Sequence, residues 1–378
     1  MNKTYRNLII SLVVIFLIFL WAGKYNNTPI NESDLRAKIG QMLIVGFRGL
    51  EADTDSSIVK AINDLNLGGV ILFDYDVPSS GEMKRNITDP EQTKELIKNL
   101  KSASPSLFVA VDSEGGLINR LKDKYGFTNI PSAENMGLED PDQTKEHALF
   151  LGNQLRELGF NVNFAPVVDV NINPENPVIG GIQRSFSEDP EVVTAHASSF
   201  ISGLNENNII SAIKHFPGHG SSEDDSHLGL VDITNTYQTE ELIPYREIIN
   251  SGYNDMVMTA HVMNTNIDAD YPATMSPNFL QNILREELGF NGVIVSDDMQ
   301  MGAITEHFGF EEAIIKSINA GCDLLIISNN GGEYSEEDYY RAVDIIFNAV
   351  MSGEINIETI NNSYNRIMEI KKRYSLTN

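Results

Sequence analysis

The sequence contains very little cysteine and comparatively few basic residues. Cys322 is the one cysteine among 378 residues, which excludes a disulfide framework, and its apolar surroundings in AGCDLLIIS predict a buried, inert thiol. Lysine and arginine together number 27, against 53 aspartate and glutamate residues, so the formal net charge is −26. This charge argues against nucleic acid or anionic lipid headgroups as binding partners.

Internal repeats, low-complexity tracts and Pro/Gly/Ser-rich linkers are also missing after residue 33. The apolar share of 42% and the charged share of 21% are typical of a folded protein with a sizeable core. We therefore expect residues 34–378 to form one domain.

The first 33 residues differ from the rest of the chain. Lys3 and Arg6 precede the apolar run Leu8–Ala22, which only Ser11 interrupts, and a polar spacer follows up to residue 33. The possible signal-cleavage sites near Trp21-Ala22-Gly23 put Trp or Leu at the −3 position, which suits cleavage poorly, and the segment has no cysteine that could carry a lipid. We expect an uncleaved membrane anchor that leaves the remaining chain outside the cytoplasm. A cleaved signal peptide is the alternative, and a buried core helix is disfavoured because the segment has no polar face.

Short apolar runs alternate with amphipathic stretches from residue 34 onward. The predicted strands are Met42–Val45, Gly69–Phe73, Leu107–Val111, Val162–Val168, Ile209–Lys214, Met256–Thr259, Val293–Ser296 and Leu324–Ile327. The predicted helices are Ser56–Leu65, Pro90–Leu100, Gln143–Leu158, Pro190–Leu204, Glu240–Ile249, Pro277–Leu288, Glu311–Ala320 and Glu337–Met351, with a closing helix over Ile357–Tyr374. Eight strand-helix units in this order predict a single (β/α)8 TIM-type barrel, and a doubly wound open sheet is the alternative.

Polar residues follow six of these predicted strands. They include Asp112 to Gly116, Asp169, Lys214-His215, His261, Asp297-Asp298 and Ser328-Asn329. Because catalytic groups of such barrels gather at the carboxyl ends of the strands, these residues predict a polar site there.

The segment KHFPGHGSSEDDSH, from Lys214 to His227, combines three histidines with several carboxylates around two glycines and a proline. Its glycines and proline indicate a shaped loop. Asp225 precedes His227 by two residues, so the carboxylate can orient the imidazole and raise its proton affinity. The alternative is a solvated acidic loop with incidental histidines.

Asp297 directly follows a predicted buried strand and should face the mouth of the barrel, whereas Asp298 is the better candidate for a helix cap. With His227 as proton donor, Asp297 could attack an anomeric carbon. Glycoside hydrolysis with retention of configuration requires this pair of roles.

Several motifs resemble those of the family-3 glycoside hydrolases, in particular the bacterial β-N-acetylhexosaminidases of peptidoglycan turnover. The motifs are KHFPGHG followed by DSH, VDSEGG with Arg120 downstream, RSF at Arg184–Phe186, and VIVSDDM. The resemblance runs from about Gln41 to Lys371. It departs from the family pattern at Leu117, Gln183 and Ser221, which leaves details of the sugar subsites and of the leaving group open.

The resemblance implies a retaining β-N-acetylhexosaminidase that acts on amino-sugar glycans, as a monomer and without a cofactor or metal. It implies that Asp297 is the nucleophile and that His227 is the acid/base, paired with Asp225. The residues that it assigns to sugar binding are Asp112, Arg120, Arg184, Lys214 and His215.

Other functions remain as alternatives. A metal-dependent hydrolase could use His215, His219, His227 and Asp225 as ligands, but the H-x-H pair common in such sites does not occur. A β-glucosidase-type or phosphorolytic enzyme of the same family is the second alternative. The third is a catalytically silent, membrane-tethered glycan-binding protein, against which Asp225, His227 and Asp297 argue. His219 is expected to shape its loop, and His261 receives no role.

Overall fold

The computed structural model describes residues 30–225 and 229–377. The chain divides into two compact units, residues 1–36 and residues 37–378. Residues 30–36 are the described part of the first unit and include the start of helix α2, Glu32–Gln41. The following paragraphs concern the second unit.

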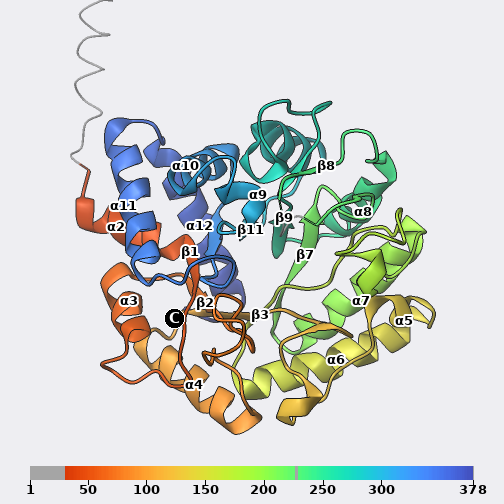
Figure 1. Cartoon of the computed structure of the whole chain (residues 1–378), viewed down its shortest axis with the longest axis horizontal. Helices are drawn as coiled ribbons and strands as arrows, with labels where there is room; N and C mark the ends of the chain where they lie inside the picture. The colour runs from red at the N-terminus through yellow and green to blue at the C-terminus, as the bar shows by residue number, and fades with distance from the viewer. Residues whose placement is uncertain (1–29, 226–228, 378) are drawn as a thin grey trace, which may run out of the picture. The chain divides into compact units, whose positions relative to one another are not determined.

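Eight parallel strands close into a barrel at the centre of the second unit (Figure 1). They are β1 Leu43–Gly46, β2 Gly69–Ile71, β3 Phe108–Val111, β6 Val162–Asn163, β7 Ile210–Phe216, β9 Met256–Thr259, β11 Val293–Asp298 and β12 Leu324–Ile327. Each strand pairs with the next barrel strand along the chain, and β1 also pairs with β12 to close the ring. The predicted TIM-type barrel is thereby confirmed, and the open-sheet alternative is wrong.

Helices surround the barrel, as Figure 1 shows, and most lie where the sequence predicts them. They are α3 Ser57–Leu65, α4 Pro90–Ala103, α6 Pro141–Leu158, α7 Pro190–Glu206, α8 Ile243–Asn250, the π-helical segment Asn278–Glu287, α10 Phe310–Ala320, α11 Glu337–Ser352 and α12 Ile357–Arg373. Three of them begin at an Asp-Pro pair, in which Asp89, Asp140 or Asp189 accepts a hydrogen bond from a backbone N–H of the first turn. The proline fits there because its missing N–H would have no partner within the helix.

The fourth barrel strand is shorter than predicted. Strand β6 ends at Asn163, whereas the apolar run suggested a strand to Val168. The side-chain amide of Asn163 hydrogen bonds to the backbone N–H and carbonyl of Ser113 at 3.0 and 2.8 Å. Pro166 then removes a backbone donor, and Val167 keeps a single bridge to Lys214.

Two small sheets above the barrel were not predicted. Strands β4 (Ser113–Gly115) and β5 (Ile118–Asn119) form an antiparallel pair, and β8 (Val231–Asp232) pairs in parallel with β10 (Val262–Met263). Strands of two or three residues are too short to give a period-two pattern. The β4–β5 pair follows β3 directly.

The predicted burial of Cys322 is confirmed, and burial raises the pKa of its thiol. None of the helices within residues 30–225 and 229–377 is both long and apolar enough to cross a bilayer. The predicted anchor, Leu8–Ala22, lies outside the described residues.

Candidate active site

A cavity of about 340 Å³ lies at the carboxyl ends of the barrel strands. Its deeper walls carry apolar side chains from the strands and from the loops that follow them, Ile71, Phe73, Phe164, Met258 and Ile326. Its polar side chains are Asp112, Glu114, Arg120, Arg184, Lys214, His215, Asp225, Asp297, Asp298, Ser328 and Asn330. An apolar cavity with a few converging polar groups is the usual form of a small-molecule site.

Glu114, in the β4 strand, contacts two cations, Lys214 in β7 and Arg184 in the loop before α7. Its carboxylate accepts two hydrogen bonds from the guanidinium of Arg184, at 2.8 Å from Nε and 2.7 Å from Nη2. The Nζ of Lys214, in β7, lies 2.6 Å from the same carboxylate and 2.9 Å from Asp112. Charge-assisted hydrogen bonds therefore hold β4, β7 and the loop before α7 together at the cavity wall.

Burial and charge oppose each other in this cluster. Burial alone would raise the pKa of the Glu114 carboxyl, but Arg184 and Lys214 lower it well below its usual range. Burial alone would lower the pKa of Lys214, whereas Asp112 and Glu114 raise it above the ordinary value. Glu114, Arg184 and Lys214 are therefore charged at neutral pH, and they present fixed charges to a ligand.

The ring of His215 is fixed by partners on both of its nitrogens. Nδ1 lies 2.7 Å from the fully buried carboxylate of Asp169, and Nε2 lies 3.2 Å from Nη2 of Arg184. Because the carboxylate accepts and the guanidinium donates, we assign the ring proton to Nδ1. Burial alone would raise the pKa of Asp169, but the His215 ring lowers it.

Arg120 stands apart from this cluster. Its guanidinium lies over the ring of Phe73, at 5.4 Å from the ring centroid, and its Nη1 is 3.9 Å from Asp74. Asp74 makes its shorter contact, 2.6 Å, with Lys122. The Nε of Arg120 is buried and has no hydrogen-bond partner among the described residues.

Glu241 holds the loop that follows β7 through hydrogen bonds to its backbone. The Oε2 of this buried carboxylate accepts the backbone N–H groups of Gly220 and Ser221 at 3.0 and 3.2 Å. Gly218 adopts a φ of 132°, and a Cβ at this position would lie 2.7 Å from the Glu241 side chain. The loop is thus a shaped element, as predicted, and it brings Asp225 to the cavity wall.

His227 lies outside the described residues, so its part in the site stays a prediction. The two other histidines in question are structural. His219 is buried, with Nδ1 2.7 Å from the hydroxyl of Ser222. His261 is also buried and lies 2.9 Å from the hydroxyl of Thr274. Neither His219 nor His261 is part of the cavity wall.

The two adjacent aspartates at the end of β11 have different surroundings. Asp297 is half-buried and lines the cavity, and its Oδ1 accepts the N–H of Asp298 at 2.8 Å. Asp298 instead bonds to the backbone N–H and hydroxyl of Ser328, in the loop after β12. Burial raises the pKa of Asp298 to about 6. Asp298 also accepts the N–H of Gln300 at 3.2 Å, so it fixes a turn rather than a helix end.

The structure brings most of the predicted site residues to one cavity. Its walls include Asp112, Arg120, Arg184, Lys214, His215, Asp225 and Asp297. Sequence reasoning placed Glu114 and Asp169 among the polar residues at the strand ends without a specific role, and it did not single out Glu241. A signal for Glu114 was present, because residues two apart on an extended segment share a side, which places it with Asp112. Glu241 has no comparable signal, because its partners lie about twenty residues earlier on a loop.

The described contacts also bear on the metal alternative. Within residues 30–225 and 229–377, no group of three or more His, Cys, Asp or Glu side chains is arranged to hold a metal ion. Both ring nitrogens of His215 already contact protein groups, and one of those groups is the cation Arg184. A guanidinium at that distance disfavours a second cation on the same nitrogen.

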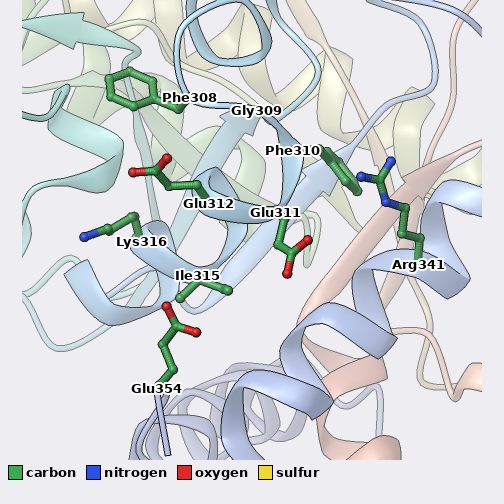
Figure 2. Close-up of a pocket in the computed structure, with 9 residues that line it drawn as sticks. All are labelled: Phe308, Gly309, Phe310, Glu311, Glu312, Ile315, Lys316, Arg341 and Glu354. Atoms are coloured by element: carbon green, nitrogen blue, oxygen red, sulfur yellow. The ribbon is translucent and has the colours of Figure 1, made fainter. Parts of the chain in front are cut away.

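A second hollow, of about 540 Å³, lies at the start of α10, as Figure 2 shows. Its lining residues are Phe308, Gly309, Phe310, Glu311, Glu312, Ile315, Lys316, Arg341 and Glu354. Most of them are exposed or half-exposed, and none is a predicted site residue. The cavity at the strand ends is therefore the candidate active site.

Comparison with known proteins gives a consistent result. The family described as "Glycosyl hydrolase family 3 N terminal domain" matches residues 34–370. A beta-hexosaminidase of Tolumonas auensis is 36% identical over 298 residues, with 76% of this chain and 83% of that protein covered. Beta-hexosaminidase A of Pseudoalteromonas piscicida is 33% identical over 335 residues, covering 83% of this chain and 54% of that protein. The chain thus spans about half the length of the Pseudoalteromonas protein.

Solved structures with the same barrel include two from this group. A glycoside hydrolase family 3 beta-N-acetylglucosaminidase from Paenibacillus gives a TM-score of 0.81 at 35% identity, over 90% of this chain and 63% of that one. The beta-N-acetylhexosaminidase from Beutenbergia cavernae gives a TM-score of 0.79 at 26% identity, over 92% of this chain and 100% of that one. The chain therefore belongs to glycosyl hydrolase family 3, the glycoside hydrolase family that its sequence motifs resemble.

Proposed function

We propose that this protein is a retaining β-N-acetylhexosaminidase that removes terminal β-linked N-acetylglucosamine from peptidoglycan-type or related amino-sugar glycans. The observation that carries the proposal is the shared cavity of Asp297 and Asp225, which follow two different barrel strands. The cluster of Asp112, Lys214 and Arg184 lines the same cavity. The names of the relatives agree with this activity.

In this proposal Asp297 is the nucleophile. Its carboxylate attacks the anomeric carbon, the glycosidic C–O bond breaks, and a covalent glycosyl-enzyme forms. Water then attacks the same carbon and releases the sugar with its configuration retained. The hydrogen bond from the N–H of Asp298 holds one oxygen of the nucleophile in place.

His227 is the proposed acid/base, with Asp225 as its partner. The imidazolium protonates the departing oxygen, and the neutral ring then accepts a proton from the incoming water. Support for this assignment comes from Asp225, which lines the cavity two residues before His227. A carboxylate beside the ring favours its protonated form, as the first step requires.

The sugar is held by Asp112, Arg120, Arg184, Lys214 and His215 in this proposal. Lys214 and Arg184 are buried, charged and fixed by Glu114, so they can donate to hydroxyl and carbonyl oxygens with little reorganisation. Arg120 lines the same cavity and lies over the ring of Phe73. Asp112 can accept hydrogen bonds from sugar hydroxyls.

The test compares hydrolysis of an aryl β-N-acetylglucosaminide with that of the aryl β-glucoside, each with and without phosphate. We expect the N-acetylglucosaminide to be cleaved much faster and to yield the free sugar in both buffers. Preference for the glucoside would favour a β-glucosidase, and a sugar phosphate product would indicate phosphorolysis. Failure to cleave either glycoside would favour a glycan-binding protein.

We further propose that the Leu8–Ala22 segment anchors a monomeric enzyme at the outer face of the cytoplasmic membrane. The proposal depends on the positive residues that precede the apolar run and on the polar spacer that follows it. Cell fractionation with sequencing of the mature N-terminus tests it. A soluble protein that begins after residue 22 would replace the anchor with a cleaved signal, and an intact chain in the cytosol would overturn both readings.

A further inference from the structure

Part of the cavity wall is apolar and also open to solvent. Four side chains from three loops share these properties, and we call them the apolar rim: Val77, Ile118, Pro177 and Ile182. Val77 is 53% exposed although it lines the cavity. Partly exposed apolar groups that border a binding cavity are suited to contact with a ligand that extends beyond it.

The exposure of Val77 is built into its loop. The neighbouring Asp76 is completely buried, and its carboxylate lies 2.8 Å from Arg48 and 3.2 Å from Arg85. The N–H of Val77 donates to the side chain of Asn330 at 3.0 Å. Because Asp76 occupies the interior and Asn330 holds the backbone, the Val77 side chain is kept at the cavity wall.

The cations of the cavity are already paired with carboxylates, so they offer little attraction to an anionic ligand. Each Lys and Arg that lines it in the described part of the chain contacts a carboxylate: Lys214 and Arg184 contact Glu114, and Arg120 approaches Asp74. The lining contains five carboxyl groups against three of these cations. The carboxyl groups belong to Asp112, Glu114, Asp225, Asp297 and Asp298.

More negative charge stands next to the cavity. Glu223 and Asp224 are exposed and immediately precede Asp225 in the loop after β7. A carboxylate on the ligand would therefore approach a surface of its own sign, without a neighbouring cation that lacks a partner among the described residues. Repulsion of this kind gives specificity by disfavouring the wrong ligand.

We propose that the apolar rim binds the sugar on the leaving-group side of the scissile bond, and that it selects an uncharged amino sugar over one that carries a carboxylate. Val77 is then a specificity-determining residue, because it presents an aliphatic surface to the C–H face of that sugar. This inference rests on the proposed β-N-acetylglucosaminidase activity, and of the substrates proposed for it favours the related amino-sugar glycans over the peptidoglycan-type ones. The enzyme should therefore hydrolyse glycans whose sugars are all neutral more efficiently than those with a muramic acid next to the terminal N-acetylglucosamine.

The test uses the whole protein and two disaccharides. In both, N-acetylglucosamine is β-1,4-linked, in one to N-acetylglucosamine and in the other to N-acetylmuramic acid. We expect kcat/KM to be about five- to tenfold higher for the neutral disaccharide at low ionic strength, and the ratio to shrink as salt is added. Equal rates, or a preference for the acidic disaccharide, would overturn the inference.

Two substitutions show whether the rim causes the preference. Val77→Lys adds a cation at the cavity wall and should raise kcat/KM for the acidic disaccharide about threefold or more relative to the neutral one. Met83→Lys adds the same charge in the same loop, at a residue that is 51% exposed and not part of the wall, and should leave the ratio unchanged. Equal shifts in both variants would assign the effect to overall charge and overturn the role of Val77.

Hydrolysis of the aryl β-N-acetylglucosaminide separates the two proposals. An enzyme that cleaves this glycoside but does not distinguish the disaccharides retains the proposed function and loses the inference about the rim. An enzyme that does not cleave it loses both.

Discussion

Glu114 and Arg184 form a bidentate ion pair at the wall of the active-site cavity, with hydrogen bonds of 2.7 and 2.8 Å. Their side chains are only 5% and 11% exposed. The two residues are separated by 69 others along the chain and lie in different βα loops. The same carboxylate also contacts Lys214. Glu114 thus positions two of the proposed sugar-binding cations without being one of the groups predicted to bind sugar.

We expect Glu114→Gln to lower both stability and catalytic efficiency. The amide leaves two buried cations without their shared counter-charge, and breaking a buried pair in this way costs about 3–5 kcal/mol. The melting temperature should fall, and kcat/KM should drop by about tenfold or more because the binding geometry is lost.

Glu287→Gln is the matched control for this substitution. Glu287 pairs with Arg246 at 3.0 Å, but both side chains are exposed, so the loss should be under about 1 kcal/mol, with kcat/KM unchanged. Thermal unfolding and steady-state kinetics of both variants provide the measurements. If Glu114→Gln behaved like Glu287→Gln, the positioning role would be disproved.

Asp297→Asn should abolish turnover while leaving the fold intact, since Asp297 is half-buried at the cavity and not in the core. We expect kcat to fall by about a thousandfold or more, because the covalent step lacks its nucleophile. Mass spectrometry of the wild type with a fluorinated, slowly turned-over substrate should locate the sugar on Asp297.

Asp298→Asn tests whether its neighbour has the different role seen in the structure. Asp298 accepts hydrogen bonds from Ser328 and Gln300 and has no part in the proposed covalent step, so this variant should still form the covalent adduct on Asp297. Labelling of Asp298, or no labelling of either residue, would contradict the nucleophile assignment.

His227→Ala should slow substrates with poor leaving groups far more than those with good ones, because only the former need protonation. The basic limb of the kcat/KM pH profile should disappear in this variant. Asp225→Ala should lose part of the same effect and move the basic limb to lower pH, since the carboxylate favours the protonated imidazole. A plot of log(kcat/KM) against leaving-group pKa gives the measurement, and an equal loss for all leaving groups would indicate a structural role for the loop.

The sequence predicted the barrel well because the signal is local. A buried parallel strand reads as a short apolar run, and the helix after it shows its own periodicity and cap. The fourth strand was predicted too long because the run stays apolar up to Val168, whereas the regular strand ends at Asn163. Hydrophobicity alone does not reveal which backbone groups lose their partners.

The site was predictable only where the motif itself carries the chemistry. Asp297 could be identified because it follows a predicted strand, and Asp225 because it precedes a histidine by two residues. The contacts of Glu114 and Asp169 depend on partners 70 and 46 positions away, whose proximity exists only after the barrel closes. The fixed orientation of the His215 ring therefore could not be derived from the sequence.

Lys371 gives a prediction about pH and stability. Its side chain is fully buried, with Nζ 2.7 Å from the side chain of Gln41, 3.0 Å from the carbonyl of Gly68 and 4.5 Å from the centroid of the Phe108 ring. Burial lowers the pKa of this lysine to about 7, whereas an unfolded lysine titrates near 10.4. Between these two values the unfolded chain binds more protons than the folded one, so the free energy of unfolding gains a positive slope with pH.

The slope should be visible as a difference between variants. Relative to Lys371→Met, the wild type should gain about 1 kcal/mol of unfolding free energy per pH unit between pH 7.5 and 9.5. Lys372→Met is the matched control, because Lys372 is exposed on the same helix, and its stability should run parallel to that of the wild type. Urea unfolding at several pH values measures all three proteins under the same conditions, which cancels the effect of the large net negative charge. A constant difference between the wild type and Lys371→Met across this range would show that Lys371 keeps its proton when the chain folds, and that its hydrogen bonds to Gln41 and Gly68 offset the cost of burying the charge.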